Sequence, residues 1–284
     1  MRKTIGIALF LGLSIFLFCG CADKEEKAKF FANSRKVTEE EFHQLLKVAN
    51  RSYDGRAGIV FDEKGFGVAA DLSRHGIRDI SALKGIYLTG LDLRGLPVVD
   101  ISVLKGIPLK KLFLEDTFVS DISVLKGVPL EVLFLGNTKV SDLSSLAGAP
   151  ITDLNLLNCP VSDISVLRAM PLKTLWLNGA KVTDISALTG SSVISLTLHR
   201  TAVSDLSPLA GTKLQRLHIG ETNVTDLAPL KDLPLTRLVF SPIKIKIGLE
   251  YIRSKATLKE VGTSFETLMP AEEFWSVYDE VTKR

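Results

Sequence analysis

Hydrophobic positions recur at a fixed interval of 21 residues through most of this sequence. The stretch from Val119 to Lys139 reads VSDISVLKGVPLEVLFLGNTK, and close copies of it stand before and after. Each copy opens on a valine that an aspartate follows two places later; these valines are Val98, Val119, Val140, Val161, Val182, Val203 and Val224. Because one coil of this length cannot hide its own leucines from water, the constant period predicts a solenoid of stacked coils.

Each repeat divides into a strand half and a turn half. Around LKKLFLED and LKTLWLNG, apolar and variable residues alternate, as in a short strand with one face packed inward. The turn half, such as VSDISVLKG, reverses the chain in so few residues that we expect a single 3₁₀-like turn. Serines stand where the N-cap of that turn is expected: Ser102, Ser123, Ser165, Ser186 and Ser207.

Eight such units run without insertion from Ile77 to Lys244. They predict an α/β solenoid with a parallel β-sheet on its concave face, short 3₁₀ turns on its convex face, and small caps at both ends. We expect a signal peptide at 1–20, a flexible tether at 21–37, an N-terminal cap and first strand at 38–76, repeats at 77–244 and a C-terminal cap at 245–284.

The expected caps have their own patterns. TEEEFHQLLKVAN predicts an amphipathic helix, and Ala70 and Leu72 fall in register with the leucine pairs of the later strands. The tail predicts a short helix, a strand and a final helix, with four residues covering the last repeat: Phe274, Trp275, Tyr278 and Val281.

The repeat consensus resembles the short leucine-rich repeats of bacteria, of the internalin-like and SDS22-like type; VSDLSPLAG at 203–211 is nearly their motif. The resemblance covers about 60 per cent of the chain and implies a horseshoe that binds partners without catalysis. Many such proteins carry an asparagine ladder that bonds to the neighbouring backbone. Here that position holds Thr117, Thr138, Cys159, Ala180, Thr201, Thr222 and Ile243. We expect threonine hydroxyls to replace part of the ladder.

The first residues predict export. MRKTIGIALFLGLSIFLFCGC begins with two basic residues and continues with about 14 apolar or small ones, fewer than the roughly 20 that span a membrane. Its ending, FCGC, resembles a bacterial lipoprotein signal, which implies lipidation of Cys21 and anchoring at the cell membrane or the outer membrane. Phe18 stands where that signal usually has leucine. The alternative is an uncleaved signal anchor.

Composition and charge exclude several functions. The formal net charge is only +3, so the sequence predicts no attraction to nucleic acid. With three cysteines, two of them near the start, no disulfide framework is expected. There is no glycine-rich nucleotide loop and no clustered nucleophile and base, so we expect neither enzymatic activity nor a cofactor.

The variable outward positions of the strands are the candidate binding surface. We expect a protein or peptide ligand there, with three aromatic residues, Phe113, Phe134 and Trp176, contacting its apolar part. Polar contacts are expected from His199, Arg216, His218 and Arg237. Two alternatives stay open: the rings simply stack on one another to support the sheet, or the protein is a carbohydrate-binding protein or hydrolase of the cell surface.

Two patterns raise the question of metal binding. The aspartates from Asp79 to Asp226 recur once per repeat, but a lone carboxylate per coil lacks the further oxygens that calcium needs. We therefore expect each to bond to the backbone of its own turn. His199 and His218 on neighbouring strands, with Glu221, form a weaker candidate metal site. The alternative is that the two histidines are ordinary surface residues that bind no metal.

Overall fold

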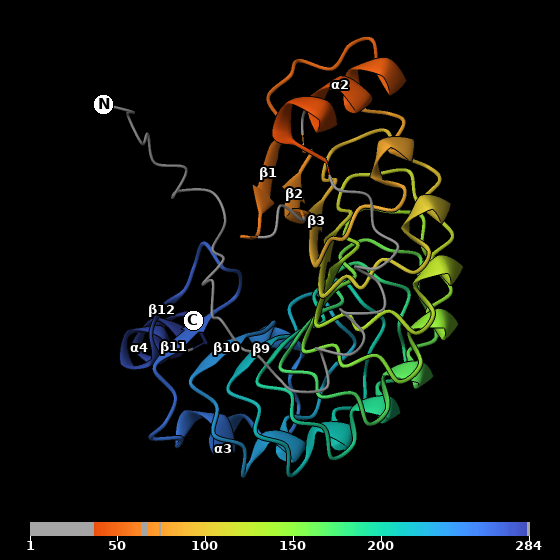
Figure 1. Ribbon diagram of the computed structural model, residues 1–284. Coiled ribbons are helices and arrows are strands. Elements are labelled where there is room, and N and C mark those ends of the chain that lie inside the picture. The colour runs from red at the N-terminus through yellow and green to blue at the C-terminus, as the bar shows by residue number, and fades with distance from the viewer. Residues whose placement is uncertain (1–36, 64–66, 74, 283–284) are drawn as a thin grey trace. The chain divides into compact units, whose positions relative to one another are not determined.

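Twelve strands form one sheet in the part of the chain that this computed structural model describes, residues 37–63, 67–73 and 75–282 (Figure 1). The strands follow one another across the sheet in chain order. Strands β2 to β11 pair in parallel, and the outermost pairs, β1–β2 and β11–β12, are antiparallel. Their bounds are β1 Gly58–Phe61, β2 Gly67–Asp71, β3 Gly90–Asp92, β4 Lys111–Phe113, β5 Val132–Phe134, β6 Asp153–Asn155, β7 Thr174–Trp176, β8 Ser195–Thr197, β9 Arg216–His218, β10 Arg237–Val239, β11 Glu260–Gly262 and β12 Met269–Pro270.

The middle residue of every repeat strand is a buried leucine, and these leucines lie in register across the sheet. They are Leu91, Leu112, Leu133, Leu154, Leu175, Leu196, Leu217 and Leu238. Ala70 continues the series on β2 and Val261 on β11, so the core extends beyond the repeats at both ends. Burying one leucine contributes about 1.5–3 kcal/mol, so this column adds stability at every coil of the stack.

A 3₁₀ turn follows on the outer side of each coil, as expected (Figure 1). The turns are η1 Ser81–Leu83, η2 Ser102–Leu104, η3 Ser123–Leu125, η4 Ser144–Leu146, η5 Ser165–Leu167, η6 Ser186–Leu188, η7 Ser207–Leu209, η8 Ala228–Leu230 and η9 Pro242–Lys244. Together with the sheet, they make the described chain an open solenoid. The expected fold class is therefore confirmed.

The predicted serine N-caps are wrong, because each serine is the first residue of its turn and donates its amide to the aspartate two residues earlier. In η2 the Oδ1 atom of Asp100 accepts a hydrogen bond from the Ser102 amide at 2.7 Å, and no serine side chain caps the turn. The same bond recurs in the first eight turns, from Asp79 to Asp226. The expectation that these aspartates bond to their own turns is confirmed. Hydrogen bonding to Ser123, mainly to its amide, lowers the pKa of the Asp121 carboxyl.

Threonines bond mainly within their own coil, not to the neighbouring one as the sequence predicted; the exception is Thr138, whose hydroxyl lies 3.5 Å from Cys159 Sγ in the next coil. The Thr117 hydroxyl donates to the Leu114 carbonyl of its own coil, and Thr138, Thr201 and Thr222 behave in the same way. Cys159 does reach across, since its Sγ lies 3.0 Å from the Leu135 carbonyl oxygen. At the same position of their repeats, Ala180 is buried, whereas Ile243 is 96% exposed and is not part of the buried series.

A polar ladder does exist, one position before the expected one. The Nδ2 atom of Asn137 donates to Asp116 Oδ1, and that of Asn158 donates to Asn137 Oδ1, both at 2.8 Å. These three residues have positive φ, a conformation that asparagine and aspartate tolerate better than most residues. Main-chain amides at the same level bond to the next coil, such as Asn137 N to Leu157 O at 2.7 Å. The backbone is thus satisfied by the chain itself.

The N-terminal cap begins with helix α2, Glu39–Ala49, as predicted. Thr38 and Glu41 form a capping box at its start. At its end, the Asn50 side chain accepts from the Arg78 and Asp79 amides at 2.7 and 2.8 Å, and it donates to the Asp79 carbonyl. One buried amide group therefore fixes the helix to the first turn.

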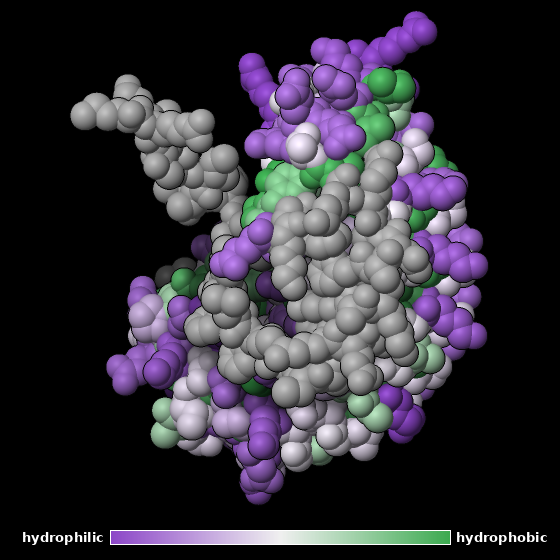
Figure 2. Space-filling view, in the orientation of Figure 1, coloured by the Kyte–Doolittle hydropathy of each residue, from purple (hydrophilic) through white to green (hydrophobic). Residues whose placement is uncertain are grey.

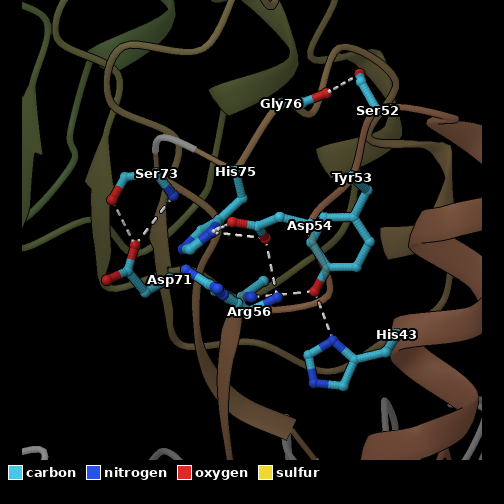
Figure 3. A network of polar contacts seen from close by, with 10 residues as sticks. His43, Ser52, Tyr53, Asp54, Arg56, Asp71, Ser73, His75 and Gly76 are labelled. Atoms are coloured by element: carbon cyan, nitrogen blue, oxygen red, sulfur yellow. Dashed lines mark hydrogen bonds and ion pairs between the residues drawn. The ribbon is translucent and has the colours of Figure 1, made fainter.

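Polar contacts close the loop between α2 and β1 (Figure 3). The Tyr53 hydroxyl accepts from the Ala57 amide at 3.0 Å and lies 2.5 Å from Nδ1 of His43. His75 Nδ1 lies 3.0 Å from Asp54, and this bond is the main cause of the lowered pKa of the Asp54 carboxyl. These contacts join residues of the cap to each other, and their geometry indicates a structural role.

The C-terminal cap consists of α3, Leu249–Arg253, then β11, β12 and α4, Ala271–Thr282. Phe274 and Trp275 are buried against Phe240, with ring centroids 6.1 and 6.4 Å from its ring, and Tyr278 packs partly against the same core. Val281 is exposed, so its predicted role as cover is wrong. Strand β12 was not expected from the sequence.

The signal peptide predicted at 1–20, Cys21 and nearly all of the predicted tether lie outside the described residues. Among residues 37–63, 67–73 and 75–282, none of the helices could serve as a membrane span. Hydrophilic side chains predominate over α2 and along the outer edge formed by the 3₁₀ turns, while apolar ones reach the surface around β1 and β2 (Figure 2).

Candidate functional site

The last residue of each strand forms a column along the concave face, in the register that the sequence predicted. Strand pairing aligns Asp71, Asp92, Phe113, Phe134, Asn155, Trp176, Thr197, His218 and Val239. These side chains point away from the leucine column, because neighbouring residues of a strand face opposite sides of the sheet. The side chains of this column therefore form the centre of the concave face.

The three aromatic residues form a continuous row in its middle. The rings of Phe113 and Phe134 meet edge to face, with centroids 5.2 Å apart. Trp176 lies two strands away from Phe134 and still contacts it at 5.4 Å, which places its indole beside the intervening Asn155. The rings therefore do support one another, as one of the two interpretations expected. All three remain half-buried, so part of each ring stays on the surface.

A charged group flanks the row on its N-terminal side. The guanidinium of Arg94 lies over the Phe113 ring at 5.4 Å and forms an ion pair with buried Asp92 at 2.5 Å. Burial raises the pKa of the Glu115 carboxyl, and its Oε2 atom is buried without a hydrogen-bond partner. This end of the face thus combines an aromatic ring with a carboxyl group that is only partly satisfied.

The other side of the row is covered, which the sequence did not predict. Thr197, His218 and Val239 are buried, although all three stand in the outward column. Phe265, from the segment between β11 and β12, packs edge-on against His218 with centroids 4.6 Å apart. His199 stacks on the other side at 4.7 Å. His218 is therefore buried and not exposed on the open surface, and its contact with a ligand stays a prediction.

The environment of His218 is unusual for a histidine. Neither ring nitrogen has a hydrogen-bond partner, and the residue is 5% exposed. Burial, followed by the nearby His199, lowers the pKa of His218 to about 4. His199 differs, since it is half-buried and its Nδ1 donates to the Gly220 carbonyl at 3.0 Å.

The two predicted arginines are not equivalent. Arg216 is exposed and forms no ion pair with any residue in the described ranges. Arg237 instead pairs with Glu260 of β11 at 2.6 Å. Sequence reasoning missed Glu260 and Phe265, because both come from the cap and reach the face only through the folding of the tail.

Metal binding finds no support in the described part of the chain. No group of three or more histidine, cysteine, aspartate or glutamate side chains there has an arrangement that could hold a metal ion. His199 Nε2 lies 3.8 Å from Glu221, but that carboxylate pairs more closely with Arg200, at 3.0 Å. Cys159 is a free cysteine buried inside the repeats.

The parallel sheet, the recurring 3₁₀ turns and the buried leucine column define the described chain as a leucine-rich repeat solenoid. Two solved structures from Listeria monocytogenes are similar to it. The internalin InlF matches over 85% of this chain and 67% of its own, with a TM-score of 0.63 and 24% identity. Internalin C2 matches over 70% and 92%, with a TM-score of 0.56 and 21% identity.

At these identities the similarity concerns the fold. No protein-family model and no curated protein matches the sequence.

Proposed function

We propose that this protein is a non-catalytic binding or scaffold module of the bacterial cell envelope, which holds a protein or peptide ligand on its concave face. The row of Phe113, Phe134 and Trp176 carries the proposal. Half-exposed aromatic rings that hold one another in place present a rigid apolar surface, and ordering it on binding costs little conformational entropy. Such aromatic side chains are typical of interface hot spots.

The charge distribution supports the same use of the face. Arg216 near one end of the row is a cation without an ion pair to a described residue, while Arg94 at the other end covers Phe113 but is paired with Asp92. Interfaces are enriched in this combination of aromatic residues and arginine. The leucine-rich repeat fold is also one whose curved strand surface commonly serves for recognition.

Replacing two of the rings tests the proposal. We expect the double variant Phe113→Ser, Trp176→Ser to recover far less partner than the wild type from envelope extracts, because each lost hot spot weakens binding by about 2 kcal/mol. Crosslinking from position 176 followed by mass spectrometry identifies the bound protein. Phe118→Ser is the matched control, since Phe118 is an exposed phenylalanine outside the strands. Equal recovery by the double variant and the wild type would refute the role of the row.

We further propose that Cys21 carries a lipid that anchors the protein to the membrane, as the FCGC segment implies. Metabolic labelling with a fatty acid is expected to mark the wild type and not Cys21→Ala, and detergent-phase partitioning should follow the label. Cys159→Ala should retain the label, because that thiol is buried in the repeats. An unlabelled wild type would refute the anchor.

A further inference from the structure

A small cavity lies on the concave face where the C-terminal cap meets the repeats. Its volume is about 150 Å³, and it is lined by Trp176, Thr197, Arg216, His218, Arg237 and Phe265 among others. One wall belongs to the repeat strands β7 to β10, and another is supplied by Phe265 of the cap. The cavity adjoins the aromatic row, since Trp176 belongs to both.

Two buried polar side chains in this cavity have no partner. The Thr197 hydroxyl and both ring nitrogens of His218 lack hydrogen bonds, although these residues are only 6% and 5% exposed. Buried polar groups are nearly always satisfied, because leaving one unpaired costs the full desolvation of that group. Because the low pKa keeps the His218 ring neutral at pH 7, it offers one donor and one acceptor. Together with Thr197, the cavity therefore has unused hydrogen-bonding capacity.

The charged side chains around the cavity favour a ligand group that carries a single negative charge. Arg216 stands two residues before His218 on β9, so both side chains lie on the same face of the strand, and its guanidinium has no ion pair with a described residue. Arg237 is already neutralised by Glu260. Glu266, whose charge acts on His218, would repel a dianion such as phosphate more strongly than a monoanion.

A carboxylate fits these features. Its planar pair of oxygens matches the guanidinium fork of Arg216, and the same oxygens accept hydrogen bonds from hydroxyl and imidazole donors. We propose that the cavity between Trp176, His218 and Phe265 is a subsite for a carboxylate of the peptide ligand, paired with Arg216 and hydrogen-bonded by Thr197 and His218. This inference rests on the proposed function, because it specifies what part of a ligand on the concave face enters the cavity.

Short peptides test the subsite directly. The probes are acetyl-Phe-Glu-amide, with a side-chain carboxylate, acetyl-Phe-Gln with a free C-terminal carboxylate, and acetyl-Phe-Gln-amide, with neither. We expect at least one of the two carboxylate peptides to shift the NMR signals of the Trp176 indole and the His218 ring saturably. The neutral peptide should bind about tenfold more weakly, because it cannot form the charged pair with Arg216. Which of the two acids binds better distinguishes an acidic side chain from a chain terminus.

Arg216→Gln and Thr197→Val supply the matched variants. Both should fold as the wild type does, since Arg216 is exposed and valine has nearly the shape of threonine. Arg216→Gln is expected to abolish the preference for carboxylate peptides, and Thr197→Val to weaken it. The inference is overturned if neither acid shifts these signals at millimolar concentration, if the neutral peptide binds as well, if inorganic phosphate binds more tightly, or if Arg216→Gln keeps the preference.

The failure of the subsite can be told apart from failure of the proposed function. The pull-down from envelope extracts separates the two. If Arg216→Gln recovers partners as well as the wild type does, while the double variant of Phe113 and Trp176 loses them, the subsite is refuted and the proposed binding by the concave face still stands. Loss of partners in both supports the subsite.

Discussion

Leu175→Ala is expected to lower the free energy of unfolding by about 2–5 kcal/mol, the largest effect of any single substitution considered for this protein. Leu175 is fully buried in the middle of β7 and lies in register between Leu154 and Leu196. Removing its side chain leaves a cavity shared by three coils. Because each coil is stabilised only by its neighbours, the strands on both sides lose packing as well.

Chemical denaturation followed by circular dichroism measures this effect. Lys173→Ala in the same repeat is the control, since the Lys173 side chain is exposed, and its substitution is expected to change stability by no more than about 0.5 kcal/mol. Similar losses for the two variants would contradict a continuous leucine core. Hydrogen exchange should in addition show faster opening of the coils on either side of residue 175.

Acidification from pH 6.5 to pH 4 is expected to destabilise the protein by up to about 3 kcal/mol through His218 alone. Burial lowers the pKa of this histidine to about 4 in the folded protein, whereas in the unfolded chain it has the ordinary value near 6.5. Between these values the unfolded chain binds more protons, so stability falls as the pH falls. The stability that comes from keeping His218 neutral is fully present above pH 6.5 and is lost as the pH falls through about 4.

The charged groups around His218 leave this sign unchanged. His199 lowers its pKa further, whereas Glu221 and Glu266 raise it, and burial is the largest cause. His218→Phe keeps a ring against Phe265 and removes the titration, so its stability should vary less over the same pH range. His199→Gln should retain most of the dependence. Unfolding curves at a series of pH values measure both, and an unchanged slope in His218→Phe would contradict the buried neutral ring.

Much of the fold was predictable because it repeats. The alternation around residues such as Leu112 and Phe113 determines which side chains turn inward, and the constant period of 21 residues requires them to align from coil to coil. The aspartate of each turn needs only local geometry to bond to its own backbone, and this too was predictable. The role of Ser102 was misjudged, because Ser102 is the first residue of its turn and donates its own amide to Asp100, two residues earlier.

The candidate site was predictable only in part. The column containing Phe113, Phe134 and Trp176 follows from register, but the contact between Phe134 and Trp176 across Asn155 depends on side-chain directions that periodicity does not give. The predictions of an exposed His218 and a covering Val281 were wrong for a related reason. Each depends on how a tail without repeats folds back.

The sequence by itself determined the coil, the strand register and the choice of inward residues, because these follow from local alternation and from contacts with an identical neighbour. Only the tertiary structure decided which outward positions remain open. The cap places Phe265 against His218 and Glu260 against Arg237, although 47 and 23 residues of chain separate these partners. Contacts of that kind occur once in the molecule, so no repeating pattern in the sequence announces them.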